Sequence, residues 1–388
     1  MLIKLLKYSI LGLFILNIPM VVLVHMNAVF SSLLSYGSFL MLLAYYILAP
    51  KTQMNHWMIL IGLLYFSIST LSGQTYLPET NRDFYVYMAK YFIVAIAGYE
   101  LIKNVSNREM LIFLAIGAFS IVFQILYFYD PLRDSGRYSG FYLNPNGMGF
   151  ICLMGYALTF SLGKSKWKLP AQILFTIMGL VTFSRTFMVL WILVNLISLK
   201  YSVKNVRVFV LGFFLLLAVI TYNEILPVKN PRIEQISALI SGESLSSSGL
   251  GEDSRTDTWS NYYGAVSQKP FLGHGFDSFR GHTQWGVVGP HNTYLKIIGE
   301  AGIIVLVVFL LFMLSTLRKS WDCFHRQPHL FMMSLAFVLY LATNHNYFDT
   351  GYMLFMIMWL YHNSKEYSLQ DPDEDLAIAD HAKMESGN

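Results

Sequence analysis

Repeated apolar runs, each close to the length of a bilayer, are the feature that most restricts this chain. One example is IIVLVVFLLFML at 303–314, and similar runs recur along most of the sequence. About 20 apolar residues cross a bilayer as one helix, and only helices or closed barrels satisfy every backbone group in lipid. The chain is 55% hydrophobic and only 13% charged, whereas soluble proteins are about a quarter charged. These features predict an all-α, polytopic integral membrane protein.

The apolar runs predict about twelve transmembrane helices and one long outer loop. The predicted spans are 8–26, 29–49, 57–73, 84–102, 110–129, 141–162, 169–183, 186–199, 208–226, 294–317, 329–344 and 349–363. Residues 1–226 hold the first nine spans, 227–293 form the long extracytoplasmic loop with a short helix, and 294–363 hold the last three. Residues 364–388, which include DPDEDLAIAD, are acidic and polar and are expected to be a disordered cytoplasmic tail.

The distribution of Lys and Arg predicts the orientation. With the N-terminus in the cytoplasm, basic clusters such as Lys164–Lys168 and Lys200–Arg207 fall on the cytoplasmic side. The short outer loops then hold few basic residues, which are Arg82, Arg133, Arg137 and Arg185. Short loops rich in Lys and Arg resist translocation, so both termini are expected in the cytoplasm. The chain has no nucleotide-phosphate loop, so we do not expect it to hydrolyse ATP.

The segment VTFSRTFM (181–188) lies between two basic clusters that are both expected in the cytoplasm. The chain must therefore cross the membrane and return, which places Arg185 at the tip of an outer hairpin. Each arm has only about 15 apolar residues, or ~22 Å of helix, which is shorter than the ~30 Å hydrocarbon core. Arg185 is thus expected to be recessed below the outer surface, where it can receive an anion. The alternative is a snorkelling or salt-bridged arginine.

Within the long loop, EDSRTDTWSNYYGAVSQKP (252–270) begins like a capped helix and ends at a proline. Arg255, Trp259 and Tyr262 share one face at helical spacing. An arginine beside the free amides of a helix N-terminus suits a phosphate, and the two aromatic residues offer flat surfaces to sugar rings. The alternative is an amphipathic helix whose aromatic residues lie at the level of the lipid headgroups.

The segment RDSGRYSGFYLNPNGMGF (133–150) presents Arg137 and then Asn144-Pro145-Asn146-Gly147 as the chain enters the sixth predicted span. Proline, glycine and two asparagines permit a tight turn whose amide groups point into the outer vestibule. Arg137, Asn144 and Asn146 are therefore candidate substrate-binding residues. The alternative is a plain loop.

The segment GPHNTYLKIIGEAG (289–302) keeps polar residues where an apolar span begins. Because Pro290 fits the first turn of a helix, His291 and Asn292 are expected at the N-terminus of the tenth span. The helix dipole there disfavours imidazolium and leaves a neutral ring that accepts a proton or hydrogen bond. The alternative is an interfacial histidine. The nearby His274, Asp277 and His282 do not have a spacing typical of metal ligands, and no metal site is predicted.

These segments resemble the O-antigen ligase and O-antigen polymerase family of bacterial envelope glycosyltransferases. The resemblance is carried, in order, by RYSGFYLNPNG (137–147), TFSR (182–185), SRTDTW…KPFLGHG (254–275) and HNTYLKIIGEAG (291–302). It implies a location in the bacterial cytoplasmic (inner) membrane. It also implies an inverting transfer, without a metal or other cofactor, of a glycan from undecaprenyl diphosphate to a glycan hydroxyl on the outer face. By position in these motifs, Arg185 and Arg255 would bind the diphosphate and His291 would act on the acceptor, with Arg137 a weaker correspondence.

The resemblance leaves the acceptor open. A repeat-unit polymerase for O-antigen, capsule or exopolysaccharide extends another lipid-linked repeat unit, whereas a ligase joins the polysaccharide to lipid A-core. The NPNG turn favours the polymerase. Expected partners are the lipid-linked donor, the glycan or lipid A-core acceptor, membrane lipid and a chain-length regulator, with no nucleic acid. A polysaccharide flippase is a third candidate, but it would show repeat symmetry, and no repeat is found.

Overall fold

The structure is a computed structural model that describes residues 1–72, 80–128, 136–225, 255–283 and 286–369. Most of these residues are helical, and the two strands form one antiparallel hairpin. The elements are α1 (Leu2–Ile15), α2 (Ile18–His25), α3 (Ala28–Leu48), α4 (His56–Leu71), α5 (Thr80–Ile93), η1 (Val94–Gly98), α6 (Tyr99–Ile102), α7 (Asn107–Phe123), η2 (Gln124–Phe128), η3 (Gly140–Tyr142), α9 (Pro145–Leu158), η4 (Thr159–Leu162), α10 (Lys168–Val181), α11 (Arg185–Tyr201), η5 (Val203–Asn205), α12 (Val206–Ile225), α14 (Arg255–Gln268), β1 (Gly281–Thr283), β2 (Gly286–Val288), α15 (Thr293–Asp322), α16 (Pro328–Leu341) and α17 (Gly351–Leu369).

Several of these helices are suited to a membrane. Among the described residues, four helical segments are long and apolar enough to cross it, and the bent pair α1–α2 makes a fifth if it forms one span. The four are Ala28–Leu48, Asp83–Ile102, Asn107–Phe128 and Thr293–Asp322, and the shorter apolar helices are α4, α10 and α16. The membrane class is therefore supported, while the count of twelve spans stays a prediction.

The structure revises the start of the predicted tail and adds elements within the predicted long loop. Helix α17 continues to Leu369, so the first residues of the predicted disordered tail are helical, and 370–388 lie outside the described residues. In the predicted long loop, 227–254 also lie outside them, but the remainder forms α14 and the β1–β2 hairpin. The sequence analysis had predicted only a short helix there.

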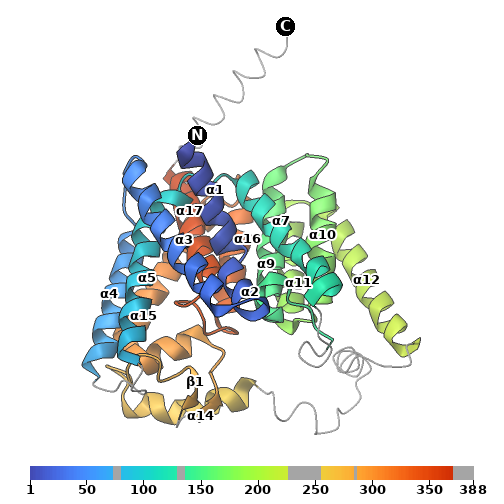
Figure 1. Ribbon diagram of the computed structural model, residues 1–388. Helices are drawn as coiled ribbons and strands as arrows, with labels where there is room; N and C mark the ends of the chain where they lie inside the picture. Colours follow the sequence, from blue (N-terminus) through green and yellow to red (C-terminus); the bar gives the residue numbers. More distant parts are fainter. Residues whose placement is uncertain (73–79, 129–135, 226–254, 284–285, 370–388) are drawn as a thin grey trace.

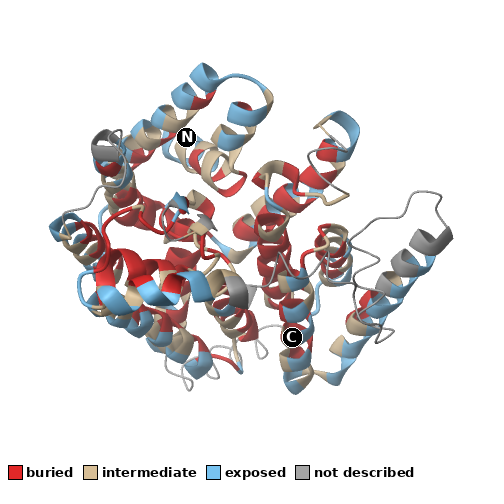
Figure 2. Ribbon diagram, turned by 90° about the horizontal axis from the view of Figure 1, so that it is seen from below, coloured by how far each residue is buried: buried red, intermediate tan, exposed pale blue. Residues whose placement is uncertain are grey.

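Helices α9 and α17 form the centre of the bundle. From Gly147 to Leu158 every residue of α9 is buried, and so is every residue of α17 from Tyr352 to Leu360. A helix that is apolar on all sides belongs inside a bundle, because no face of it prefers water. Helix α9 packs against α7, α10, α11 and α16, and α17 packs against α1, α15 and α16. Figure 2 shows the buried positions gathered in the middle of the bundle.

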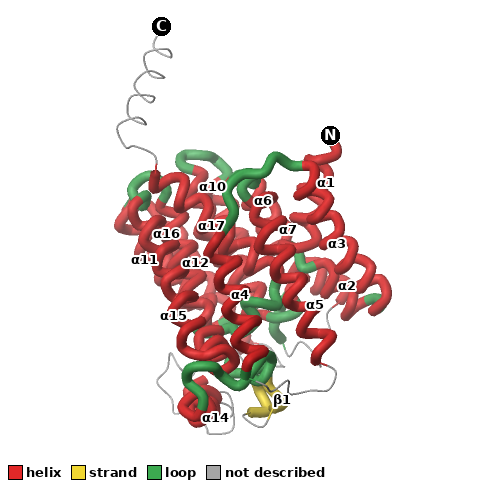
Figure 3. The backbone as a smooth tube through the Cα atoms, turned by 90° about the vertical axis from the view of Figure 1, so that its left-hand side faces the viewer, coloured by secondary structure: helices red, strands yellow, loops and turns green. Residues whose placement is uncertain are grey.

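Helix α14 and the β1–β2 hairpin cap one end of the bundle, opposite the N-terminus (Figures 1 and 3). We call this end the hairpin end. Tyr262 of α14 is fully buried there against Phe279 and donates a hydrogen bond from its hydroxyl to the carbonyl of Val288, at 2.7 Å. This small second core fixes α14 on the hairpin.

Helix α15 is not the continuous span that the sequence predicted, because its backbone is broken at Gly302. That residue has φ 82° and ψ 179°, a conformation open essentially to glycine alone. A Cβ atom there would lie 1.9 Å from the carbonyl oxygen of Phe271. The break therefore depends on glycine, and it leaves backbone groups of α15 without their usual helical partners.

The segment Lys269–Gly275, which has the sequence KPFLGHG, supplies the missing partners. The amides of His274 and Gly275 donate to the carbonyls of Gly299 and Glu300, at 2.7 and 3.0 Å, and the amide of Ile303 donates to the carbonyl of Pro270, at 2.8 Å. Unpaired backbone groups are costly in lipid, so a broken helix must be repaired by protein in this way. Two sequence motifs, KPFLGHG and GEAG, thus meet as one structural unit.

We predict that Gly302→Ala destabilises the protein by about 1–3 kcal/mol, because alanine cannot adopt the backbone conformation at the break without strain. The thermal unfolding temperature of the purified protein in detergent measures this effect. Gly37→Ala in α3 is the matched control, because a Cβ at Gly37 meets no atom within 4 Å. Equal stability of the two variants would contradict the account of the break.

Candidate functional site

The amino ends of four helices meet at the hairpin end. Asn146 in the first turn of α9 accepts a hydrogen bond from the hydroxyl of Ser184, the N-cap of α11, at 2.8 Å. A Cβ at Gly147 of α9 would touch the hydroxyl of Tyr352 in α17. The hydroxyl of Thr293, the first residue of α15, donates to the carbonyl of Asn344, before α17, at 2.6 Å. Helix amino ends carry partial positive charge, so this arrangement favours an anion.

Two of the predicted arginine segments lie side by side. The guanidinium of Arg137 donates to Asn146 Oδ1 at 3.4 Å and to the carbonyl of Thr182 at 3.5 Å. Asn146 Oδ1 thus accepts from both Arg137 and Ser184. The RYSGFYLNPNG and TFSR motifs are thereby joined by polar contacts, although some 40 residues separate them in the sequence. We call Arg137, Asn146, Ser184 and Arg185 the arginine cluster.

Arg185 is the first residue of α11 and is exposed. The hydroxyl of Ser184 caps the helix by accepting from the amide of Phe187 at 3.3 Å. Within the described part of the chain, the guanidinium of Arg185 makes no hydrogen bond or ion pair, so the salt-bridged alternative finds no support there. A free guanidinium at a capped helix amino end suits a phosphate group. The depth of Arg185 in the membrane stays a prediction.

The side-chain oxygen of Asn144 caps a helix. Asn144 is the N-cap of α9, and its Oδ1 accepts from the amides of Asn146 and Gly147 at 2.8 and 3.4 Å. Asparagine is a preferred N-cap because its side chain satisfies amides that the helix leaves open. This oxygen therefore helps to start α9, and Asn146 is the residue of this turn that belongs to the arginine cluster. A role of Asn144 in substrate binding stays a prediction.

His291 and Asn292 lie at the amino end of the tenth predicted span, as expected, but the helix begins later than Pro290 suggested. Helix α15 begins at Thr293, and Asn292 is its N-cap, accepting from the amide of Leu295 at 3.1 Å. His291 precedes the cap in a left-handed conformation, with φ 47°. The side-chain oxygen of Asn292 is thus used in capping, while its role in substrate binding stays a prediction, and Pro290 does not belong to the helix. His291 nevertheless stays next to a helix amino end and is partly buried.

His345 is the neighbour of His291 that the sequence analysis missed. Their ring centroids are 4.9 Å apart and the rings are inclined at 66°. Among the described residues, the Nδ1 atom of His345 is buried without a hydrogen-bond partner. Burial, with the positive charge of Lys296 nearby, lowers the pKa of His345 to about 3. The ring is therefore neutral at physiological pH. A polar run between two apolar helices, TNHNYFDT (343–350), was the available signal.

The same 342–350 loop carries Asp349, which pairs with a buried lysine. Lys296 of α15 is almost fully buried and donates to Asp349 Oδ2 at 3.3 Å. Glu300, one turn later, is fully buried and accepts from the Tyr65 hydroxyl and from the amide of Phe279. Buried charges persist when they are paired and hydrogen-bonded. These bonds connect α4, α15, the 342–350 loop and the segment before β1.

The face of α14 that carries Trp259 and Tyr262, which was predicted to bind sugar, is used mostly for packing. The prediction that Tyr262 offers its ring to a sugar is wrong, because the ring is fully buried, and burial raises the pKa of its hydroxyl to about 12. Trp259 is partly buried, and its indole N–H donates to the carbonyl of Pro290 at 2.9 Å. Trp259 therefore braces the backbone beside His291. Arg255 starts α14, one turn before Trp259, but its side chain lies outside the described residues.

The three residues considered as metal ligands do not form a ligand set. His274 Nε2 contacts the carbonyl oxygen of Ala265 at 2.7 Å, and Asp277 pairs with Arg280 at 2.9 Å. No group of three or more His, Cys, Asp or Glu is placed to hold a metal ion in the part of the chain that the structure describes. His274 instead connects α14 to the KPFLGHG segment, which pairs with the open backbone groups of α15.

Comparison with known proteins identifies a family for part of the chain. Residues 170–310 match the family model described as O-antigen ligase. The matched stretch includes Arg185, Arg255 and His291, whereas Arg137, Asn144 and Asn146 precede it. This match confirms the resemblance that the sequence motifs indicated. Searches of curated proteins and of solved structures found no match.

We predict that wild-type protein loses stability as the pH falls from about 6.5 toward 3 and that His345→Gln reduces this loss. In this window the unfolded chain takes up a proton at His345, with its ordinary pKa of about 6.5, while the folded protein does not. The free energy of unfolding therefore falls with pH. Melting temperatures at pH 7 and pH 5 measure the slope. His56→Gln, at the exposed start of α4, is the control, and an unchanged slope in His345→Gln would contradict the prediction.

Proposed function

Because the chain carries an O-antigen ligase family domain, we propose that it transfers a glycan from a polyprenyl diphosphate carrier to a hydroxyl group of an acceptor glycan. The carrier is undecaprenyl diphosphate, and the reaction takes place at the outer face of the bacterial cytoplasmic membrane. The observation that carries the proposal is the meeting of four helix amino ends, the arginine cluster and the His291–His345 pair at one end of an apolar bundle.

The arginine cluster holds the diphosphate of the donor. Arg185 supplies the free guanidinium and Arg137 a second one, half-buried and held by Asn146. Arg255 completes the set from the start of α14. Planar guanidinium groups bind phosphate oxygens in pairs, and fixed positive charge lowers the energy of the leaving group as its negative charge grows. These residues neutralise the diphosphate in place of a metal ion.

His291 acts on the acceptor. The acceptor hydroxyl oxygen attacks the anomeric carbon of the donor sugar, and the bond from that carbon to the phosphate oxygen breaks on the opposite face. The diphosphate leaves with the bonding electrons, the hydroxyl proton passes to a ring nitrogen of His291, and the configuration is inverted. General-base catalysis of this kind contributes about 10²- to 10⁴-fold in rate. The neutral ring of His345 adds no positive charge beside His291, so His291 remains able to accept a proton.

The acceptor distinguishes two forms of the reaction. We propose a repeat-unit polymerase, in which the acceptor glycan is itself carried on a lipid diphosphate, because the NPNG turn of the polymerase-like motif is built into the arginine cluster. A ligase, with lipid A-core as acceptor, is the second candidate, and the description of the matching family model favours it. Both forms use the same donor site and the same histidine.

We predict that His291→Ala lowers transfer by about 10²- to 10⁴-fold while donor binding stays within a few-fold of wild type. Arg185→Lys should instead weaken donor binding, because a lysine cannot make the paired contacts of a guanidinium. Membrane vesicles with lipid-linked donor allow both quantities to be measured in one preparation.

His56→Ala is the matched control, since His56 is exposed at the start of α4, away from the hairpin end (Figure 1). It should bind donor and form product like wild type. Near-normal product from well-expressed His291→Ala would rule out a catalytic role for His291. Full donor binding by Arg185→Lys would show that paired guanidinium contacts are not needed to bind the diphosphate.

A further inference from the structure

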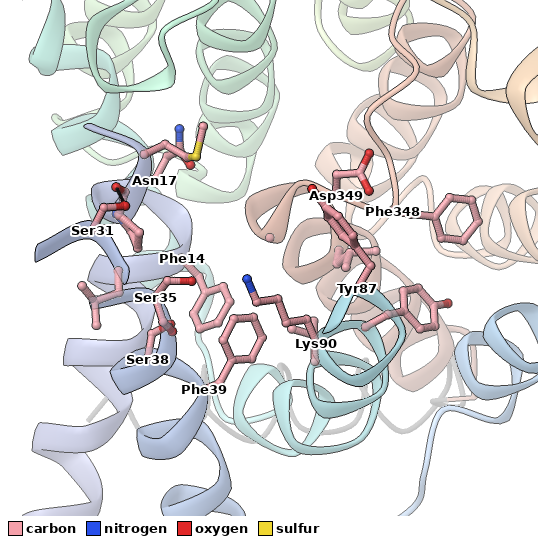
Figure 4. A pocket seen from close by; sticks show the side chains of 17 residues that line it. Phe14, Asn17, Ser31, Ser35, Ser38, Phe39, Tyr87, Lys90, Phe348 and Asp349 are labelled. Carbon is pink, nitrogen blue, oxygen red and sulfur yellow. Dashed lines mark hydrogen bonds between the residues drawn. The ribbon is translucent and has the colours of Figure 1, made fainter. Parts of the chain in front are cut away.

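A cavity of about 220 Å³ lies beside the bend between α1 and α2. Its walls come from the break between α1 and α2, from α3, from α5 and from the start of α17 (Figure 4). The break begins at Asn17, in a left-handed conformation with φ 56°, and bends the chain by 55°. The bend opens space that a straight helix would fill.

Lys90 supplies a positive charge to this cavity. Figure 4 shows its amine directed into the space between Phe39 on one side and Tyr87 with Asp349 on the other. The amine lies 5.4 and 5.6 Å from the ring centres of Tyr36 and Phe39. Within the described part of the chain it makes no hydrogen bond or ion pair. Asp349, across the cavity, is already paired with Lys296.

A half-buried lysine of this kind needs an explanation. Helix Asp83–Ile102 is one of the candidate membrane spans, and a charge within a span is costly unless it is paired or functional. Aromatic rings compensate an ammonium group only in part. A negatively charged ligand in the cavity removes the remaining cost, so the cavity is suited to an anion.

The cavity borders both lipid and the site described above. Helix α3 has the smallest buried share of the four candidate spans, 22%, and α2 and α3 expose Met20, Leu33 and Leu40. On the inner side, Asp349 and Phe348 belong to the loop that carries His345. The side-chain Nδ2 of Asn17 also donates to the carbonyl of Phe141, in the RYSGFYLNPNG motif, at 3.3 Å. An amphiphile held here has its apolar part toward lipid and its head toward the histidines.

We propose that this cavity binds the phosphate headgroup of a second lipid, the polyprenyl diphosphate that carries the acceptor glycan. This inference rests on the proposed function, and it favours the polymerase, in which both substrates are carried on the same kind of lipid. Lys90 binds the acceptor carrier from α5, and the arginine cluster binds the donor carrier from α9 and α11. The 342–350 loop and the start of α17 lie between the two sites, where the acceptor hydroxyl meets His291.

Native mass spectrometry of the purified protein with a short-chain polyprenyl diphosphate that bears no glycan tests this inference without requiring transfer. Wild-type protein should bind two carriers. Lys90→Met should lose one of them and Arg185→Gln the other, whereas Lys90→Arg should keep both. Lys51→Met is the matched control, because Lys51 also lies over an aromatic ring, Tyr46, but does not line the cavity.

A second variant tests whether the volume of the cavity, and not only the charge of Lys90, is needed for binding. Ser35→Phe fills the cavity and leaves Lys90 in place, so it should also lose one carrier. If Lys90→Met and Ser35→Phe each still bind two carriers, the proposed second site is wrong. It is also wrong if wild-type protein binds a single carrier that Arg185→Gln removes. Either result would leave the donor site intact. If Arg185→Gln keeps both carriers, the donor site of the proposed function fails instead.

Competition with an ordinary phospholipid tests whether the cavity binds the carrier lipid or bulk membrane lipid. Excess phosphatidylglycerol should leave the Lys90-dependent carrier bound, because a single phosphate of an ordinary lipid offers the lysine less negative charge than a diphosphate. Displacement of that carrier by phosphatidylglycerol, with loss of the phosphatidylglycerol in Lys90→Met, would overturn the proposal in favour of a site for bulk membrane lipid.

Discussion

The break in α15 at Gly302 is the constraint on which the hairpin end depends. A helix that is interrupted inside an apolar bundle must find partners for its open backbone groups, and the KPFLGHG segment provides them. A Cβ at Gly273 of that segment would lie 2.4 Å from the backbone of Glu300, so the segment and α15 approach as closely as glycine allows. The approach fixes the segment that leads to Phe279, whose amide binds Glu300. Position and orientation of the hairpin follow from these contacts.

The break also determines where His291 lies. Residues Thr293–Ala301 form a short helical piece ahead of the break, and its capped start is held by Asn292 and by the bond from Thr293 to Asn344. Trp259 holds the carbonyl of Pro290 from the other side. His291 is therefore positioned by two structural units that are far apart in the sequence, α14 and the 342–350 loop. The same loop brings His345 and Asp349 to the site.

Electrostatics explains why substrate groups gather at this end. The starts of α9, α11, α15 and α17 contribute partial positive charge, and the arginine cluster adds full charges. Carboxylates at this end, such as Asp349 and Asp277, are paired with Lys296 and Arg280. The net field thus favours a diphosphate, the most highly charged part of a lipid-linked glycan.

The sequence predicted the helices well because apolar runs report burial in lipid or protein directly. The run predicted at 29–49, for example, is α3 (Ala28–Leu48). The site was predicted less completely. Periodicity placed Trp259 and Tyr262 on one face but does not say whether that face meets solvent or a second core. Asn144 and Asn292 were predicted as substrate-binding residues, and the structure adds that both are N-caps, a role that asparagine favours. The contacts of Asn146 with Ser184 and of His291 with His345 depend on tertiary structure, and a single sequence does not contain them.

The most direct test of the account is transfer by the purified protein in liposomes that contain only lipid-linked repeat units and EDTA. The account predicts that new glycosidic bonds and free polyprenyl diphosphate appear in equal amounts, because each new bond releases one carrier. Product that forms only after lipid A-core is added would identify the ligase. Movement of the lipid-linked glycan across the bilayer without release of any carrier would contradict the central claim that the protein is a glycosyltransferase.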